Sequence, residues 1–124
     1  MERRRASSGS PFEPTIGFSR AVRVGERVLV SGTGPVGADD GDADTQMRRC
    51  IEIVAGALEE LGATLEDVVR TRTYLTDASD ADAIAAVHGE VFGAVRPAAT
   101  MLVVKALLDP RWSVEIEAEA LVRS

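Results

Sequence analysis

Apolar positions recur at two different spacings along the chain, and the changes in spacing predict where strands and helices lie. Within Phe18–Val30, two β-favouring runs flank Gly25-Glu26, a pattern typical of a β-hairpin. A helical spacing begins after Asp42 or Asp44, either of which can cap a helix, and Gly62 is a stop signal. The core-facing stripe of this helix comprises Met47, Cys50, Ile51, Val54, Leu58 and Leu61.

The second half of the chain predicts one more helix and three more strands. Val68–Leu75 alternates as a strand. Its predicted inward side chains are Val69, Thr71, Thr73 and Leu75, and its outward ones are Arg70 and Arg72. Ser79 and Asp82 form a capping signature for a helix. The apolar face of this helix consists of Ile84, Val87, Val91 and Phe92. Two last strands are expected at Thr100–Leu107 and Val114–Val122.

The resulting order is ββαβαββ, without strict alternation of strand and helix. This order favours the α+β class, with a mixed sheet and two helices on one face of a single domain. Two helices cover only one face of such a sheet, so the other face requires a partner and we expect an oligomer. Residues 1–13 are predicted to form a flexible tail, and residues 14–124 the folded domain.

Charge and cysteine content narrow the function classes. Fourteen Lys and Arg oppose twenty Asp and Glu, for a net charge of −6. An acidic chain repels phosphate, which weighs against nucleic acid as a partner. No segment approaches the ~20 apolar residues that a membrane span requires. A single cysteine excludes an internal disulfide. We therefore expect a soluble cytoplasmic protein that does not enter membranes.

The last predicted strand carries three glutamates at alternate positions. Period two places Glu115, Glu117 and Glu119 on one face, about 7 Å apart. One interpretation is a solvated face, or pairing with Arg70 and Arg72 of a neighbouring strand. The other is that one glutamate lies in a cleft, where burial or like charge raises its pKa and makes it a general base.

Other candidate chemistry is sparse. His88, the only histidine, lies on the flank of the second helix, where packing is the simpler role. Cys50 falls in the apolar stripe and is expected to be an inert buried thiol. One histidine and one cysteine do not make a zinc site, so no metal is predicted. Ser31–Gly34 matches neither a phosphate loop nor a dinucleotide fingerprint, so no cofactor is predicted.

Two segments form a further pattern: Arg96–Leu107 followed by Val114-Glu115-Ile116-Glu117, and the first hairpin through Ser31-Gly32. Together they resemble the RidA (YjgF) family, formerly called endoribonuclease L-PSP. Gln46 and Gly62 also fit, and the similarity extends over about residues 17–122. It implies a fold like that of the small trimeric chorismate mutases, a homotrimer, and clefts between subunits that bind a small molecule.

The resemblance also implies roles for individual residues. Glu115 matches the glutamate that positions water in relatives that hydrolyse enamines and imines such as 2-aminoacrylate. Phe18 matches an aromatic that lines the cleft. The remaining predicted binding residues are Ser31, Gly32, Ala99, Thr100 and Met101.

Ala99 departs from the family pattern, because active relatives carry an arginine there that clamps the substrate carboxylate. Alanine cannot supply this bidentate pair. Arg20 or Arg96 is a candidate substitute. Two functions therefore stay open: a Glu115-based hydrolase with weak or absent 2-imino acid deaminase activity, and a non-catalytic regulatory trimer that binds a metabolite. The ribonuclease or translation-inhibitor role described for some members is a third, less favoured alternative.

Overall fold

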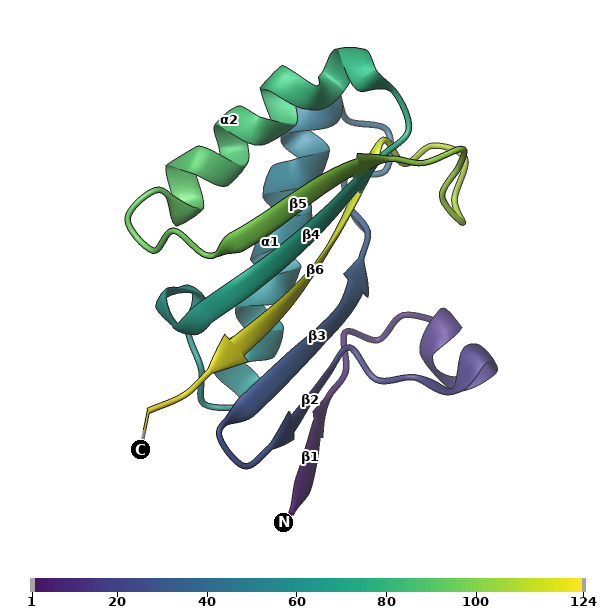
Figure 1. The fold of residues 1–124 in the computed structure, drawn as a ribbon. Coiled ribbons are helices and arrows are strands. Elements are labelled where there is room, and N and C mark those ends of the chain that lie inside the picture. The colour runs from purple at the N-terminus through teal and green to yellow at the C-terminus, as the bar shows by residue number, and fades with distance from the viewer. Residues whose placement is uncertain (1, 124) are drawn as a thin grey trace.

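A six-stranded mixed sheet with two helices on one face forms the fold, in a computed structural model that describes residues 2–123 (Figure 1). Across the sheet the strand order is β1-β2-β3-β6-β4-β5, with β4 and β5 parallel and the other neighbours antiparallel. The helices are α1 (Ala43–Glu60) and α2 (Ala81–Phe92). The strands are β1 (Arg3–Ala6), β2 (Ala21–Val24), β3 (Arg27–Thr33), β4 (Val68–Leu75), β5 (Ala98–Val103) and β6 (Val114–Leu121). The α+β class is confirmed, and the order ββαβαββ is found with one strand added before it.

The added strand corrects the prediction of a flexible tail over residues 1–13. Arg3–Ala6 pairs antiparallel with β2, from Arg3 opposite Val24 to Ala6 opposite Ala21. Ala6 is buried, so the strand contributes to the core as well as to the hydrogen-bond ladder. Pairing with β1 satisfies backbone groups that β2 would otherwise present as an open edge. These backbone hydrogen bonds allow a strand to form although its three arginine side chains are exposed and add little to the core.

The helix α1 forms as its sequence predicts. The Asp42 carboxylate accepts a hydrogen bond from the Thr45 amide at 3.2 Å, which caps the helix. Gly62, just beyond its end, has a φ of +80°, a conformation that glycine adopts without strain. The predicted stripe of α1 and Leu61 is buried against the sheet.

Two strand predictions need correction. Val69 was expected to face inward, but it is 43% exposed because a bulge between Val68 and Arg70 shifts the alternation and turns Val68 inward. The strand expected at Thr100–Leu107 is β5, which ends at Val103, alongside the end of its partner β4. Thr71, Thr73 and Leu75 are buried as predicted.

The open face of the sheet carries the three glutamates of β6. The residues that alternate with them are buried on the helix side: Val114, Ile116, Ala118 and Ala120. Arg72 approaches Glu119 at 3.8 Å, and the Tyr74 hydroxyl donates to Glu117. Pairing with Arg72 is thus found for Glu119, Glu117 is held by the Tyr74 hydroxyl instead of an arginine, and Glu115 has a different environment.

Candidate functional site

Glu115 lies against the end of β3, where the strand leaves regular pairing. The register of β3 on β6 shifts between Val30 and Thr33, which places Gly32 beside the Glu115 carboxylate. A Cβ on Gly32 would lie 2.6 Å from Glu115 Oε1. Glycine is therefore required here for a close approach, although its φ is not positive.

The carboxylate of Glu115 is half-buried, and its environment favours a role in proton transfer. Burial raises its pKa, and the Glu117 charge adds to this, while the Arg20 charge partly opposes it. Within residues 2–123 no hydrogen bond reaches the Glu115 carboxylate, in contrast to Glu117. An unpaired carboxyl with a raised pKa is suited to accept a proton near neutral pH.

Arg20 supplies the buried positive charge beside Glu115. Its side chain donates to the Gly32 carbonyl at 2.5 Å, to Thr33 Oγ1 at 3.1 Å and to Ser8 Oγ at 3.2 Å. Burial lowers the Arg20 pKa, which the carboxylates of Glu13 and Glu115 partly offset. Its guanidinium carbon also lies 5.2 Å from the centre of the Phe18 ring. Arg20 is thus fixed in place at the polar end of the site.

An N-terminal turn closes over this side of the site. The chain from Ser8 leads into a π-helical turn at Glu13–Gly17. Glu13 is buried, and its carboxylate accepts bonds from the Ser8 amide and hydroxyl and from the Ser10 amide. Burial by itself would raise the Glu13 pKa, but these hydrogen bonds hold it below its ordinary value. We call residues 8–16 the flap.

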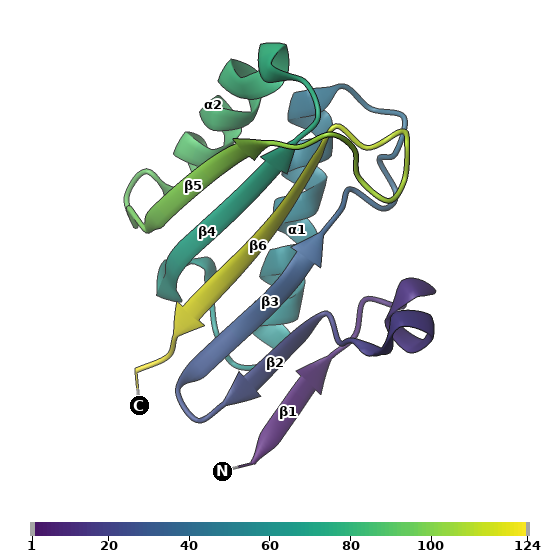
Figure 2. The same ribbon diagram turned by 45° about the vertical axis from the view of Figure 1, so that its right-hand side comes forward.

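The flap and the loops after β3 and β5 enclose a cleft of about 180 Å³. Figure 2 shows the π-helical turn on one side of the end of β3 and the two loops on the other. Of the predicted site residues, Phe18, Gly32 and Glu115 line the cleft. Ser31 lies next to it but directs its hydroxyl to the Ser19 carbonyl.

The three β5 residues do not join this cleft within one chain. Ala99 stands opposite Thr71 and Met101 opposite Thr73, both on the helix side of the sheet, and Met101 packs against the core. Thr100 stands opposite Arg72 on the open face. The grouping of Ala99, Thr100 and Met101 with Glu115 therefore stays a prediction about neighbouring subunits.

Of the two candidate substitutes for the missing arginine, only Arg20 lines the cleft. Arg96 lies in the turn before β5 with a φ of +54°, and its Nε donates to the Gly93 carbonyl. Because Nε and one terminal nitrogen of Arg20 are already bonded to protein atoms, only part of that guanidinium is free for a ligand.

Trp112 is a wall of the cleft that the sequence reasoning missed. Its indole nitrogen donates to Asp39 at 2.8 Å, and a Cβ on Gly34 would lie 2.4 Å from its ring. The indole lowers the Asp39 pKa, with help from Arg111. The available signals were a lone tryptophan after a Pro-Arg pair and a glycine in the facing loop, but neither identifies the other without a structure.

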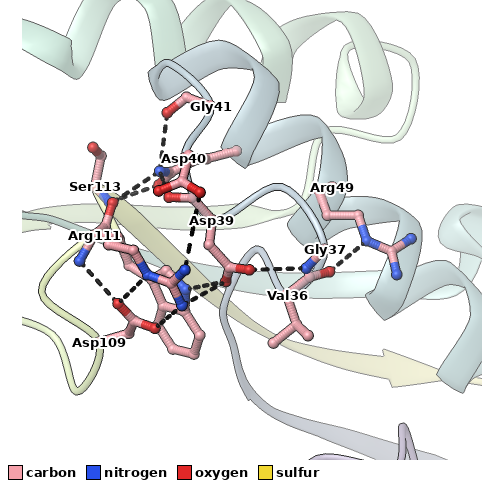
Figure 3. Close-up of polar contacts among 11 residues, drawn as sticks. Val36, Gly37, Asp39, Asp40, Gly41, Arg49, Asp109, Arg111 and Ser113 are labelled. Carbon is pink, nitrogen blue, oxygen red and sulfur yellow. Dashed lines mark hydrogen bonds and ion pairs between the residues drawn. The ribbon is translucent and has the colours of Figure 1, made fainter.

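A polar cluster holds the two loops behind Trp112. Arg111 pairs with Asp109 at 2.7 Å and approaches Asp39 at 3.9 Å (Figure 3). Gln46, buried in α1, donates to the carbonyls of Asp39, Gly41 and Arg111 and accepts from the Ser113 amide. One buried amide thus fixes both loops and, with them, the position of the indole.

His88 and Cys50 lie on the helix side, away from the cleft. His88 Nε2 is 2.8 Å from Thr71 Oγ1, its ring packs on Phe92, and burial lowers its pKa. Cys50 is fully buried, and burial raises its thiol pKa far above the ordinary value. Residues 2–123 contain no cluster of three metal-ligating side chains, and none of their helices is long and apolar enough to cross a membrane.

A single α+β domain with a mixed sheet, two helices on one face and a candidate carboxylate near the start of the interior strand β6 belongs to the YjgF-like class of fold. The sequence profile of the family described as endoribonuclease L-PSP matches residues 9–122. The chain therefore belongs to this family, also called RidA or YjgF.

Individual relatives support this assignment. Rv2704 of Mycobacterium tuberculosis, a member of the YjgF/YER057c/UK114 family, has a crystal structure that superposes with a TM-score of 0.92 at 47% identity, over 98% of this chain and 100% of that one. The uncharacterized protein SCO2049 of Streptomyces coelicolor is 41% identical, over 94% of this chain and 90% of its own length. TdcF of Escherichia coli, crystallised with bound serine, has a TM-score of 0.79 at 26% identity, over 98% and 94% of the two chains.

Proposed function

We propose that this protein binds a small metabolite in the cleft and that Glu115 hydrolyses its C=N bond. The observation that carries this proposal is the contrast along β6: Glu117 and Glu119 are paired, whereas Glu115 is unpaired, has a raised pKa and lines a cavity. The serine bound to TdcF supports a ligand of similar size for this family member too.

The chemistry assigned to Glu115 is proton transfer. Its carboxylate accepts a proton from water while the oxygen bonds to the imine carbon and the C=N electron pair moves to nitrogen. The same carboxyl then returns the proton to nitrogen. In the tetrahedral intermediate the hydroxyl proton then passes through the same carboxylate to the amino nitrogen. The C–N bond breaks with its electron pair on nitrogen, and a carbonyl compound and ammonia are released, so imine and water are the only reactants. Burial of Glu115 supports this role because it brings the pKa of the acid closer to neutral pH.

The preferred substrate differs from a 2-imino acid, because Ala99 replaces the arginine clamp. A charge-assisted bidentate bond contributes about 1.5–3 kcal/mol, so its absence weakens productive binding by roughly 10- to 100-fold. We expect slow hydrolysis or none of enzymatically generated 2-aminoacrylate, and a gain for Ala99→Arg if β5 of a neighbouring subunit reaches the cleft. A wild-type rate equal to that of an arginine-bearing relative would identify Arg20 as a sufficient clamp.

We further propose a homotrimer that buries the open face of the sheet. Arg70, on that face, has a buried Nε without a hydrogen-bond partner in residues 2–123, and exposed Leu29 and Leu102 lie on the same side. A second chain packed on this face would give the Arg70 Nε a hydrogen-bond partner and bury the two leucines. Light scattering should give three times the mass of the chain, and a stable monomer at micromolar concentration would contradict this.

Glu115→Gln separates the hydrolase from the second candidate, a non-catalytic metabolite-binding trimer. In the hydrolase it abolishes turnover of imines and preserves binding, since glutamine keeps the shape and loses the base. If wild type binds a metabolite and hydrolyses none of the imines supplied, the regulatory function is favoured. A ribonuclease would instead lose RNA affinity steeply with added salt. The net charge of −6 argues against this third function, because an acidic chain repels phosphate.

A further inference from the structure

Exposed apolar side chains gather at the cleft. Nine large hydrophobic residues are exposed in residues 2–123, and four of them line this one cleft. If exposed apolar residues were scattered at random over the surface, so many would not meet at one place. They come from three separate segments: Phe12 and Ile16 from the flap, Val36 from the loop after β3, and Leu108 from the loop after β5. We call these four residues the apolar rim.

The polar end of the cleft is small by comparison. Glu115 and Arg20 occupy it, and Arg20 already bonds to Gly32, Thr33 and Ser8. Arg49 also lines the cleft, where its Nε donates to the Val36 carbonyl at 2.7 Å and its terminal nitrogen approaches Glu52 at 3.7 Å. Both guanidinium groups are thus partly engaged by protein groups, so apolar contact has to supply much of the binding energy.

From these observations we infer that the cleft selects molecules with a branched or aromatic apolar body, about the size of a leucine or phenyl side chain. The cavity of about 180 Å³ is close to the roughly 150 Å³ that holds benzene in an apolar protein site. The apolar rim determines specificity, and Glu115 faces the polar group of the same ligand. This inference rests on the proposed function only in taking the cleft as the ligand site.

Neutral primary amides test the inference at equilibrium, without catalysis. Their planar N–C=O group resembles the carbon at which water would add, and propionamide, isobutyramide, isovaleramide and 4-methylvaleramide grow by one carbon each. Trp112 is the only tryptophan and lines the cleft, so its fluorescence reports binding. Each buried carbon should tighten Kd by about 4-fold, and the three added carbons of the series by roughly 60-fold.

Three variants identify which residues are responsible. Ile16→Ser and Leu108→Ser should flatten the series to about 2-fold per carbon, because serine removes apolar contact. Val103→Ser is the matched control, since Val103 is similarly exposed, lies on the helix side of the sheet opposite Leu75 and does not line the cleft, and it should keep the full gradient. Glu115→Gln should also keep the gradient, so loss of catalysis and loss of apolar selectivity remain distinguishable.

Three outcomes would overturn the inference. The first is equal affinity for all four amides in the wild type, and the second is an unchanged gradient in both rim variants. The third is a lower mass of Ile16→Ser or Leu108→Ser in light scattering, which would assign the apolar rim to contact with a second copy of the chain.

Discussion

Adding one methyl group at Gly32 should disable the site while leaving the fold intact. The new Cβ of Gly32→Ala would lie 2.6 Å from Glu115 Oε1. The φ of Gly32 is not positive, so the backbone itself can accept alanine without strain. Only the far end of a flexible side chain stands in its way. The carboxylate must therefore move, and the backbone of β3 can stay in place.

The displacement follows from the contact distance. Ordinary van der Waals contact begins at 3.4 Å, so the Glu115 oxygen has to withdraw from 2.6 Å by about 0.8 Å. A misplacement near 1 Å costs up to about 100-fold in rate when a catalytic group must be aligned. The stability cost is small, since a distorted side-chain rotamer costs about 0.5–1.5 kcal/mol and the change from glycine to alanine returns about 0.4–1 kcal/mol through the unfolded chain.

The assay measures release of the carbonyl product from an imine generated in place, with urea unfolding in parallel. We expect a 10- to 100-fold lower rate for Gly32→Ala and a free energy of unfolding within about 1 kcal/mol of the wild type. Gly34→Ala is the contrasting variant, because its Cβ would lie 2.4 Å from the rigid Trp112 ring. That substitution should destabilise the protein clearly.

Full activity in folded Gly32→Ala would refute the role of the Glu115 position. Unfolding of Gly32→Ala with Gly34→Ala unaffected would refute the steric argument itself, because the two variants would then have exchanged outcomes.

Three further predictions concern stability and access. Glu115→Gln should stabilise the protein at pH 7 by about 0.5–2 kcal/mol. Burial raises the folded pKa of Glu115 above its unfolded value, so wild-type stability is complete below the unfolded pKa and falls as pH rises through the folded one. Thermal unfolding should show the advantage of glutamine vanish near pH 4, and a constant advantage would contradict this. Cys50 should react slowly with thiol reagents in the native protein and quickly after unfolding, whereas fast native labelling would place it outside the core. Gly56→Ala should raise the free energy of unfolding by about 0.5–1 kcal/mol, since nothing lies within 4 Å of the new methyl in α1, and a loss of stability would reveal an unseen close contact.

The spacing of apolar residues predicted most helices and strands correctly, because in each of them the apolar positions coincide with the buried face. The stripe from Met47 to Leu58 and the alternation of β6 both reflect a single buried face, and a single face is a periodic signal. Arg3–Ala6 escaped prediction because its burial depends on an edge that β2 provides from elsewhere in the sequence. Val69 was misplaced because a bulge interrupts the period that the prediction assumed.

The candidate site was only partly predictable for a similar reason. Glu115, Phe18 and Gly32 were found through alternation and family resemblance, and the structure brings them together. Trp112 and the flap were missed, since their approach depends on loops whose conformations carry no periodicity. Gln46 illustrates the difficulty, because one buried amide binds four backbone groups from two loops that are far apart in the sequence.

The buried charges at the cleft suggest how the chain can keep a carboxylate unpaired there. Arg20 is the cation whose charge lowers the Glu115 pKa, and a direct ion pair would lower that pKa further and remove the use of Glu115 as a base. Hydrogen bonds to Ser8, Gly32 and Thr33 hold the guanidinium instead, while Glu13 supplies part of the opposing charge. Because Ser8 bonds to both Glu13 and Arg20, the flap helps to hold this guanidinium in place. The same N-terminal segment supplies Phe12 and Ile16 to the apolar rim.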